Sequence, residues 1–196
     1  MAPWIIGIDE VGRGPLAGPV AVGAVRASRR VLRVFCEIRE SKQLSARARE
    51  EWAARIASAR GAELDFAVAF VSASVIDRIG INPAIARALE RAIGRVATDP
   101  ARTRVLLDGG LRAPGEYKDQ QTIIRGDASE TAIAMASVVA KVARDARMAR
   151  LSLRFPGYGF ERHAGYGTAA HMAAIRSLGP SREHRRSFLR SVLQIG

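Results

Sequence analysis

Short apolar runs separated by turn residues dominate the first 38 positions of the chain. Residues 4–9 form a run of strand length that is rich in β-branched side chains. Residues 15–25 form a second apolar run, broken by glycine and proline, just after a turn. These two patterns predict buried strands that pair in antiparallel fashion, and residues 31–38 predict a third strand.

From residue 45 onward, helical patterns alternate with strand patterns. Ser45 is the predicted N-cap of a helix over about 46–60, and Asn82-Pro83 opens a second helix that reaches about residue 96. Strands are predicted at 65–71, 104–107 and 121–125, and helices at about 128–154, 168–177 and 187–193. This order predicts an α/β protein whose mixed sheet is antiparallel at one end and parallel at the other.

Carboxylates directly follow three of the predicted strands. Asp9 and Glu10 end the first strand, Asp108 ends the strand at 104–107, and Asp127 follows the strand at 121–125. If the strands that end at Asp9 and Asp108 are parallel neighbours, their acids meet at the carboxyl edge of the sheet. Converging carboxylates hold hard cations such as Mg²⁺ or Mn²⁺, and two such ions can drive phosphodiester hydrolysis.

Each of these acids also has a purely structural interpretation. Adjacent strand residues point to opposite faces, so Asp9 and Glu10 share a site only if the strand end turns one of them. Asp108 precedes a Gly-Gly turn, which is an ordinary turn position. Asp127, with Glu130 three residues later, resembles a helix capping box.

Other polar residues predict less. Asp145 follows Lys141 by four residues on the long predicted helix, which indicates an ion pair rather than catalysis. The three histidines, His163, His171 and His184, are too scattered along the sequence to indicate a metal site.

The bulk composition indicates one domain that binds a polyanion. With 196 residues, 48% of them apolar, the chain can bury a substantial core. Its net charge is +12, from 31 basic and 19 acidic residues. A GC-rich genome would explain why arginines far outnumber lysines, but it would not explain the positive excess. We therefore expect nucleic acid or another polyphosphate as the partner.

The same sequence argues against a membrane or secreted setting. No apolar run reaches the roughly 18 residues of a membrane span, and no basic region precedes an apolar stretch at the N-terminus. Cys36 is the single cysteine, so neither an intrachain disulfide nor a thiolate metal cluster can form. These features predict a cytoplasmic protein with no membrane association.

Residues 8–20 (IDEVGRGPLAGPV) resemble the opening motif of the ribonuclease HII family, the type 2 ribonucleases H. The resemblance continues in the same order through residues 41–45 (SKQLS), 107–109 (LDG), 125–127 (RGD), 136–145 (ASVVAKVARD), 155–160 (FPGYGF), 163–168 (HAGYGT) and 184–188 (HRRSF). The matching blocks therefore cover nearly the whole chain.

This resemblance implies an RNase H-like fold, with a five-stranded mixed sheet flanked by helices. We expect one catalytic domain over residues 1–196, with 168–196 as a small helical C-terminal extension, and a monomer. The family implies an endonuclease that cuts the RNA strand of RNA–DNA hybrids and incises duplex DNA at embedded ribonucleotides. Its products carry a 5′-phosphate and a 3′-hydroxyl, and its cofactor is Mg²⁺ or Mn²⁺.

The resemblance also assigns site residues. The family's catalytic, metal-binding acids fall on Asp9, Glu10, Asp108 and Asp127. Its substrate loop falls on Gly12, Arg13 and Gly14, and its junction-sensing tyrosine falls on Tyr166. A bare glycine backbone suits the reading of a ribose 2′-hydroxyl, which is both donor and acceptor. Lys42, Arg185 and Arg186 are candidate phosphate contacts.

Three positions depart from the family pattern. Glu40 replaces the usual Asp, while Ala164 and Arg125 each stand where Lys is common. These departures concern substrate affinity more than chemistry, because all four acids are present.

Two competing functions deserve a test. A non-catalytic hybrid-binding module on the same fold would bind with strong salt dependence yet cleave nothing. The sister family, ribonuclease HIII, typically carries an extra N-terminal substrate-binding domain, for which the catalytic motif beginning at Trp4 leaves no room.

Overall fold

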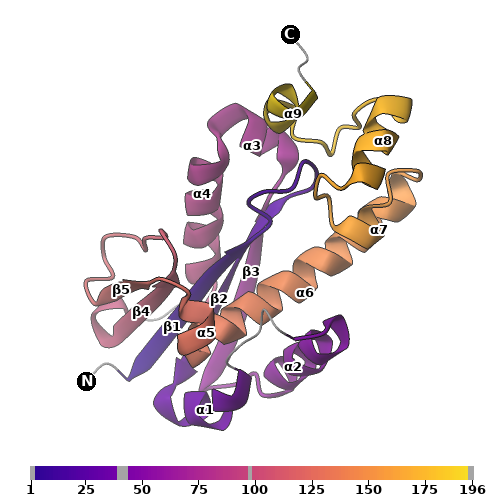
Figure 1. The fold of residues 1–196 in the computed structure, drawn as a ribbon. Coiled ribbons are helices and arrows are strands. Elements are labelled where there is room, and N and C mark those ends of the chain that lie inside the picture. The colour runs from indigo at the N-terminus through magenta and orange to yellow at the C-terminus, as the bar shows by residue number, and fades with distance from the viewer. Residues whose placement is uncertain (1–2, 39–43, 97–98, 194–196) are drawn as a thin grey trace.

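One five-stranded sheet forms the centre of the protein (Figure 1). The computed structural model describes residues 3–38, 44–96 and 99–193. The strands are β1 (Trp4–Val11), β2 (Val20–Ser28), β3 (Leu64–Val71), β4 (Thr103–Asp108) and β5 (Gln120–Ile123). Their order across the sheet is β3-β2-β1-β4-β5.

The pairing directions confirm the predicted mixed sheet. Strand β2 pairs antiparallel with both β1 and β3, whereas β4 pairs parallel with both β1 and β5. In the central pair, Ile8 lies opposite Leu107. The next residues along the two strands are Asp9 and Asp108, so the first and third acidic positions meet at one edge of the sheet.

Helices cover both faces of this sheet. They are α1 (Arg29–Val34), α2 (Ala46–Ser58), α3 (Ala73–Ile79), α4 (Ile81–Ile93), α5 (Gly126–Ser129), α6 (Thr131–Arg154), α7 (Phe160–His163), α8 (Ala169–Leu178) and α9 (Arg186–Leu193). None of these described helices combines the length and the apolar character needed to cross a membrane.

The two faces of the sheet have different packing chemistry. On one face, Ile6 and Ile8 of β1 join the side chains of α4 in the largest apolar cluster. On the other face, α6 runs diagonally across the sheet (Figure 1) and presses on the glycines of β1 and β2. A Cβ on Gly7 would lie 2.0 Å from the Ala132 carbonyl carbon, and a Cβ on Gly23 would lie 2.4 Å from the Ala136 oxygen.

The predicted third strand at 31–38 is wrong. Residues 29–34 form α1 instead, because the Ser28 side chain caps it by accepting a hydrogen bond from the Val31 amide. A short 3₁₀ turn, Cys36–Ile38, follows. This segment buries Phe35 and Ile38 at a helical spacing of three, which a short apolar run also satisfies.

Several helix boundaries also differ from prediction. The helix predicted at 128–154 is two helices, α5 and α6, separated by Glu130 in an extended conformation. Helices α3 and α7 were not predicted. The predicted helices at 46–60, 168–177 and 187–193 are confirmed as α2, α8 and α9, and Ser45 caps α2 through the Ala48 amide.

The contact between α6 and Gly7 makes a stability prediction. Gly7→Ala should lower the free energy of unfolding by about 3 kcal/mol, because the new methyl group would overlap backbone that cannot move independently. Gly115→Ala is the matched control, since a Cβ there meets nothing within 4 Å, and it should change stability by less than about 0.5 kcal/mol. Denaturant unfolding of both variants measures the difference, and equal stabilities would contradict the packing described.

Candidate active site

Asp9 lies at the centre of the site, in the last part of β1. Its neighbours Ile6 and Ile8 face α4, so the strand alternation turns Asp9 towards α6. There its carboxylate lies within hydrogen-bonding reach of the Ser137 side chain, and it also accepts a 2.8 Å bond from the Glu10 amide. Asp9 is only 5% exposed, so this carboxylate is largely removed from water.

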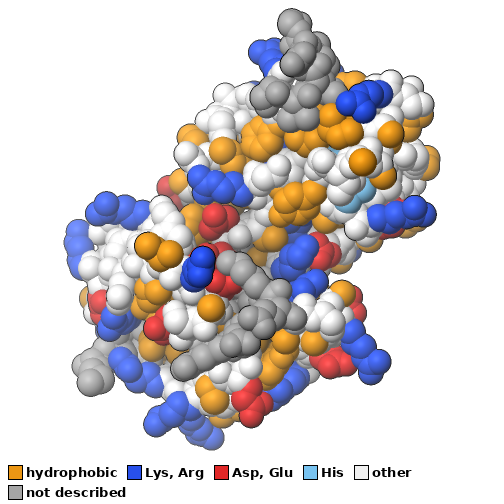
Figure 2. All heavy atoms as spheres, viewed as in Figure 1, with side chains coloured by type: hydrophobic (Ala, Val, Ile, Leu, Met, Phe, Trp, Pro, Cys, Tyr) orange, Lys and Arg blue, Asp and Glu red, His pale blue; other side chains and the backbone are white. Residues whose placement is uncertain are grey.

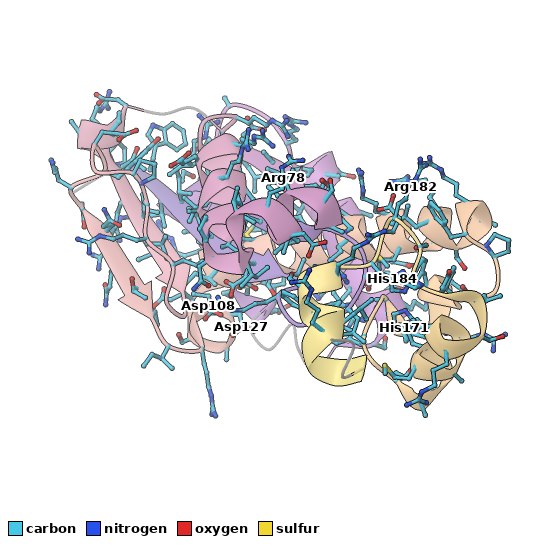
Figure 3. The ribbon with its side chains drawn as sticks, turned by 90° about the horizontal axis from the view of Figure 1, so that it is seen from above. Arg78, Asp108, Asp127, His171, Arg182 and His184 are labelled. Atoms are coloured by element: carbon cyan, nitrogen blue, oxygen red, sulfur yellow. The ribbon has the colours of Figure 1, made fainter. Side chains whose placement is uncertain are left out.

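Asp108 and Asp127 join Asp9 from the neighbouring parallel strand and the segment after β5. The Asp108 carboxylate accepts a 2.7 Å hydrogen bond from the Gly126 amide, which ties the end of β4 to the start of α5. Asp127, which is buried, directly follows Gly126 in the chain (Figure 3). Arg125 adopts a left-handed conformation (φ 55°), so the backbone turns sharply to bring these two acids together.

The alternative role of Asp127 as the N-cap of the long helix is wrong. Asp127 lies in the first turn of the short helix α5, and the extended residue before α6 is Glu130, whose side chain makes no capping bond.

The Glu10 side chain leaves β1 on the opposite face from that of Asp9. Both Asp9 and Glu10 remain within the regular strand, opposite Gly23 and Val22, so no bulge turns them to the same face. The Glu10 carboxylate lies 3.4 Å from the Arg13 guanidinium, and Arg13 also donates to the Asn82 side chain at the start of α4. Adjacent strand residues thus diverge as the alternation requires.

Burial among like charges raises the affinity of these acids for a positive charge. The pKa of Asp9 is raised to about 7, chiefly by desolvation and to a smaller extent by the negative charges of Asp108, Glu10 and Asp127, while a hydrogen bond from Ser137 opposes the rise. Burial also raises the pKa of Glu10, although Arg13 opposes this effect. A cation placed among the carboxylates would reverse both effects.

The side chains as they stand do not form a compact metal cage. Within residues 3–38, 44–96 and 99–193, no three carboxylate, histidine or cysteine side chains are close enough together to hold one ion. The divergence of Glu10 towards Arg13 contributes to this arrangement. The assignment of the four acids as metal ligands therefore stays a prediction.

A cleft of about 350 Å³ opens above Asp9 and Glu10. On the face shown in Figure 2, acidic side chains near the middle are bordered by Lys and Arg side chains. The cleft is lined by the substrate loop predicted from the sequence, by Tyr166, and by three residues that were not predicted as site residues, namely Arg49, Ser137 and Lys141. Ser137 and Lys141 are four residues apart on α6, a spacing that could have revealed them once that helix was placed over β1.

Lys141 also forms the ion pair predicted for it. Its ammonium lies 2.7 Å from the Asp145 carboxylate, one turn further along α6. Asp145 is therefore occupied by a neighbouring cation, as expected.

The substrate loop follows β1 directly. Gly12 is buried with φ 87°, and a Cβ there would lie 2.2 Å from Nε of Arg144. Arg13 and Gly14 are exposed, and a Cβ on Gly14 would meet only the Tyr166 ring, at 3.9 Å. Gly12 is thus required by packing, whereas Gly14 leaves open space beside an aromatic ring.

Tyr166 is 46% exposed and held through its backbone by the histidines. Its carbonyl accepts a 2.8 Å bond from Nδ1 of His171, whose Nε2 lies 3.1 Å from Nε2 of His184 (Figure 3). The His184 Nδ1 in turn accepts the Ser181 amide. Burial lowers the pKa of His171, and that of His184 to about 4, so both rings are neutral at pH 7 and form one directed chain of hydrogen bonds.

The three histidines, although scattered along the sequence, lie close together in the folded protein. The His163 and His171 rings stack with their centroids 4.4 Å apart, and His184 completes the group. The His163 ring of α7 and the His171 ring of α8 both pack against the ring of Phe160, which brings these residues together.

The predicted phosphate contacts have different outcomes. Arg185 is fully buried, so its prediction as a phosphate contact is wrong, whereas Arg186 is exposed. Lys42 and the departure at Glu40 lie outside the described residues. The other two departures, Arg125 and Ala164, are the only non-glycine residues with positive φ among those described.

Comparison with known proteins was made with this geometry in hand. The family model for ribonuclease HII matches residues 6–191. The chain is 48% identical to the ribonuclease HII of Parasynechococcus marenigrum, over 96% of this chain and 83% of that one. It is 38% identical to the ribonuclease HII of Caldicellulosiruptor bescii, over 98% and 89%. The chain belongs to the ribonuclease HII family. It is therefore a ribonuclease H endonuclease, a hydrolase of phosphodiester bonds.

Solved structures support the fold of this ribonuclease HII family member. The ribonuclease H2 of Pyrococcus horikoshii superposes with a TM-score of 0.75 at 21% identity, over 97% of each chain. A structure of Bst-RNase HIII in complex with Mn²⁺ superposes with a TM-score of 0.66 at 19% identity, over 95% of this chain and 65% of that one. The RNase H-like fold predicted from the resemblance is thus confirmed.

The raised pKa of Asp9 predicts a pH-dependent stabilisation by Asp9→Asn. Between pH 4 and 7, Asp9 is ionised in the unfolded chain but stays protonated in the folded protein. The free energy of unfolding of the wild type therefore falls as the pH rises, and the loss is complete above pH 7. Asn cannot ionise and escapes this cost. With a chelator present, the free energy of unfolding of Asp9→Asn should exceed that of the wild type by about 1–3 kcal/mol at pH 8, and by much less at pH 4.

Urea unfolding at several pH values measures this difference. Asp119→Asn is the control, because the Asp119 side chain is 58% exposed. A stability gain from Asp9→Asn that does not change with pH would contradict the electrostatic cause.

Proposed function

We propose that this ribonuclease HII family member hydrolyses the RNA strand of RNA–DNA hybrids and incises duplex DNA at embedded ribonucleotides. The carrying observation is the buried carboxylate of Asp9, held beside Asp108 and Asp127 with its pKa raised to about 7. A strongly basic chain that keeps a buried acidic group next to its substrate loop requires a cation there before a phosphate can approach.

The donor set fits Mg²⁺ or Mn²⁺. Asp9, Glu10, Asp108 and Asp127 offer only carboxylate oxygens, which hard divalent cations prefer. When bound, two such ions would supply an activated water and charge stabilisation for the leaving 3′-oxygen, leaving a 5′-phosphate. The Mn²⁺ complex of Bst-RNase HIII, which has the same fold, supports this choice of metal class.

The protein's own contribution is placement and charge. Asp9 and Asp108 are fixed on paired strands, and the Gly126 amide holds the Asp108 carboxylate in place. Glu10, which pairs with Arg13, is the acid that must turn most to join them. If the Glu10 carboxylate turned away from Arg13, the Arg13 guanidinium would also become free to bind a substrate phosphate.

The substrate loop would distinguish RNA from DNA. The peptide groups of Gly12, Arg13 and Gly14 border the same cleft as the acids, and the exposed Tyr166 ring lies beside Gly14. Backbone groups can both donate to and accept from a ribose 2′-hydroxyl, and an aromatic ring can stack on the adjoining sugar. Lys42 is proposed as a further phosphate contact.

The wider assignments are proposals of the same kind. We treat residues 1–196 as one catalytic domain, with 168–196 as its helical extension, acting as a monomer in the cytoplasm. The substrates named above are its proposed partners, and the net charge of +12 supports binding to their phosphate backbones.

The first test is cleavage of a duplex that contains one ribonucleotide. Wild-type protein should cut beside the ribonucleotide with Mg²⁺ or Mn²⁺, should not cut after chelation, and should leave an all-DNA duplex intact. Asp9→Asn should lower the rate by about 10²-fold or more while retaining binding, because a metal ligand is lost. Asp119→Asn, an exposed control, should cleave at the wild-type rate.

Two results would contradict this function. Cleavage that is indifferent to chelators or to Asp9→Asn would exclude the metal site. Salt-sensitive binding of the duplex without any cleavage would instead support a non-catalytic binding module.

The two loop glycines make separable predictions. Gly12→Ala should lower the free energy of unfolding by about 2 kcal/mol, because it strains a positive φ and overlaps the Arg144 side chain. Gly14→Ala should fold normally but should weaken binding of the ribonucleotide duplex about tenfold, because its methyl group occupies space proposed for the sugar. Thermal melts and fluorescence anisotropy measure the two effects. Normal binding by Gly14→Ala would place the sugar elsewhere.

A further inference from the structure

A fully buried arginine lies beneath the substrate loop. Arg185, which directly precedes α9, is 0% exposed. Its Nη2 donates to the Gly12 carbonyl at 2.7 Å, its Nη1 to the Arg13 carbonyl at 2.9 Å, and its Nε to the Gly18 carbonyl at 3.0 Å. Each of the three guanidinium nitrogens therefore donates to a main-chain oxygen of one loop.

Arg144 of α6 supports the same loop from the side. It is also 0% exposed, and it donates to the carbonyls of Pro19 and Ala164 at 3.0 Å. The missing side chain of Gly12 makes room for it. Two guanidinium groups thus hold residues 12–19.

These two cations are costly for the fold. Neither donates to a carboxylate in any hydrogen bond or ion pair of the described residues, and burial lowers the pKa of both, that of Arg185 to about 9. Buried ions that are compensated only by neutral carbonyls are a poor means of stabilising a fold. Their placement indicates a requirement for a defined loop conformation.

The geometry of the peptide bond shows which conformation is defined. In a planar trans peptide the C=O and the following N–H point in opposite directions. The Gly12 and Arg13 carbonyls point inward to Arg185, so the amides of Arg13 and Gly14 point outward. Neither amide has a hydrogen-bond acceptor within the part of the chain that the structure describes, and both residues are exposed.

We propose that Arg185 is a positioning residue that orients the Arg13 and Gly14 amides to recognise the ribose 2′-hydroxyl of the substrate. Two successive outward N–H groups form a concave donor pair suited to an oxygen ligand. The cation behind the peptides polarises them further, because it attracts the carbonyl end of each dipole. This proposal rests on the proposed function, since it assigns a cause to the selectivity for ribonucleotides.

The decisive measurement is selectivity in binding rather than rate. In an Asp9→Asn background with Mg²⁺, fluorescence anisotropy gives Kd for a duplex with one ribonucleotide and for its all-DNA counterpart. Arg185→Lys keeps a positive charge but lacks the fork, and Arg185→Met removes both. Both should lower the preference for the ribonucleotide duplex about tenfold, mainly through weaker binding of that duplex. Arg190→Met changes an exposed arginine on the helix that follows, α9, and should leave the preference unchanged.

The outcomes separate this inference from the function on which it rests. If the Asp9→Asn parent shows no preference for the ribonucleotide duplex, the proposed function fails and the inference fails with it. If the parent shows the preference and both Arg185 variants keep it, only the role of Arg185 is overturned.

Amide exchange provides a test that needs no Arg185 variant. In ¹⁵N-labelled Asp9→Asn protein, the Arg13 and Gly14 amides should exchange rapidly with solvent, unlike the paired amides of β2. Adding the ribonucleotide duplex should slow both, and the all-DNA duplex should not. Protected amides in the free protein would overturn the proposal even if the Arg185 variants failed to fold.

Discussion

The close approach of α6 to the centre of the sheet is the constraint on which the rest of the structure depends. Gly7 and Gly23 present no side chains to this helix, so backbone lies on backbone at distances that no other residue permits. The approach brings Ser137 within reach of Asp9 and puts Lys141 along the cleft. One packing contact thus sets the depth of the carboxylates and the position of the polar groups around them.

The charge of the side chains around Asp9 is opposite in sign to the net charge of the protein. A chain with a large excess of arginine surrounds a small acidic centre, and the buried position of Asp9 amplifies the repulsion among its neighbours. Such an arrangement stores unfavourable energy in the isolated protein, and a cation bound among the carboxylates would release it. The burial that makes this group of acids costly to the fold would therefore also favour a bound cation.

Much of this structure could be predicted from residue patterns, because strands and long helices have distinct periods. The antiparallel pairing of β1 with β2 was predicted from hairpin spacing, and the parallel pairing of β1 with β4 was the condition under which the acids at their ends would meet. Residues 31–38 were mistaken for a strand, since a short apolar run fits either element and only the Ser28 cap decides. The break between α5 and α6 was missed because Asp127 and Glu130 imitate a helix start.

The site was predicted less completely than the fold, for a physical reason. Residue type does not reveal burial, so Arg185 was taken for a surface cation although its fork is enclosed. Sequence distance likewise concealed the histidine group, which forms only after α7 and α8 pack. The positions of the four acids after predicted strands indicated a metal site, family resemblance assigned their catalytic role and that of Tyr166, and these roles remain predictions.

The bond from Arg185 to Gly12 joins residues 173 positions apart. A second tie, the bridge between Ala17 and His184, closes the same long circuit. During synthesis the strands β1 to β5 can assemble in order, yet the loop after β1 must wait for the segment that carries His184 and Arg185 to leave the ribosome. A nascent chain that ends before His184 would thus contain every strand of the sheet and still lack both ties that hold this loop.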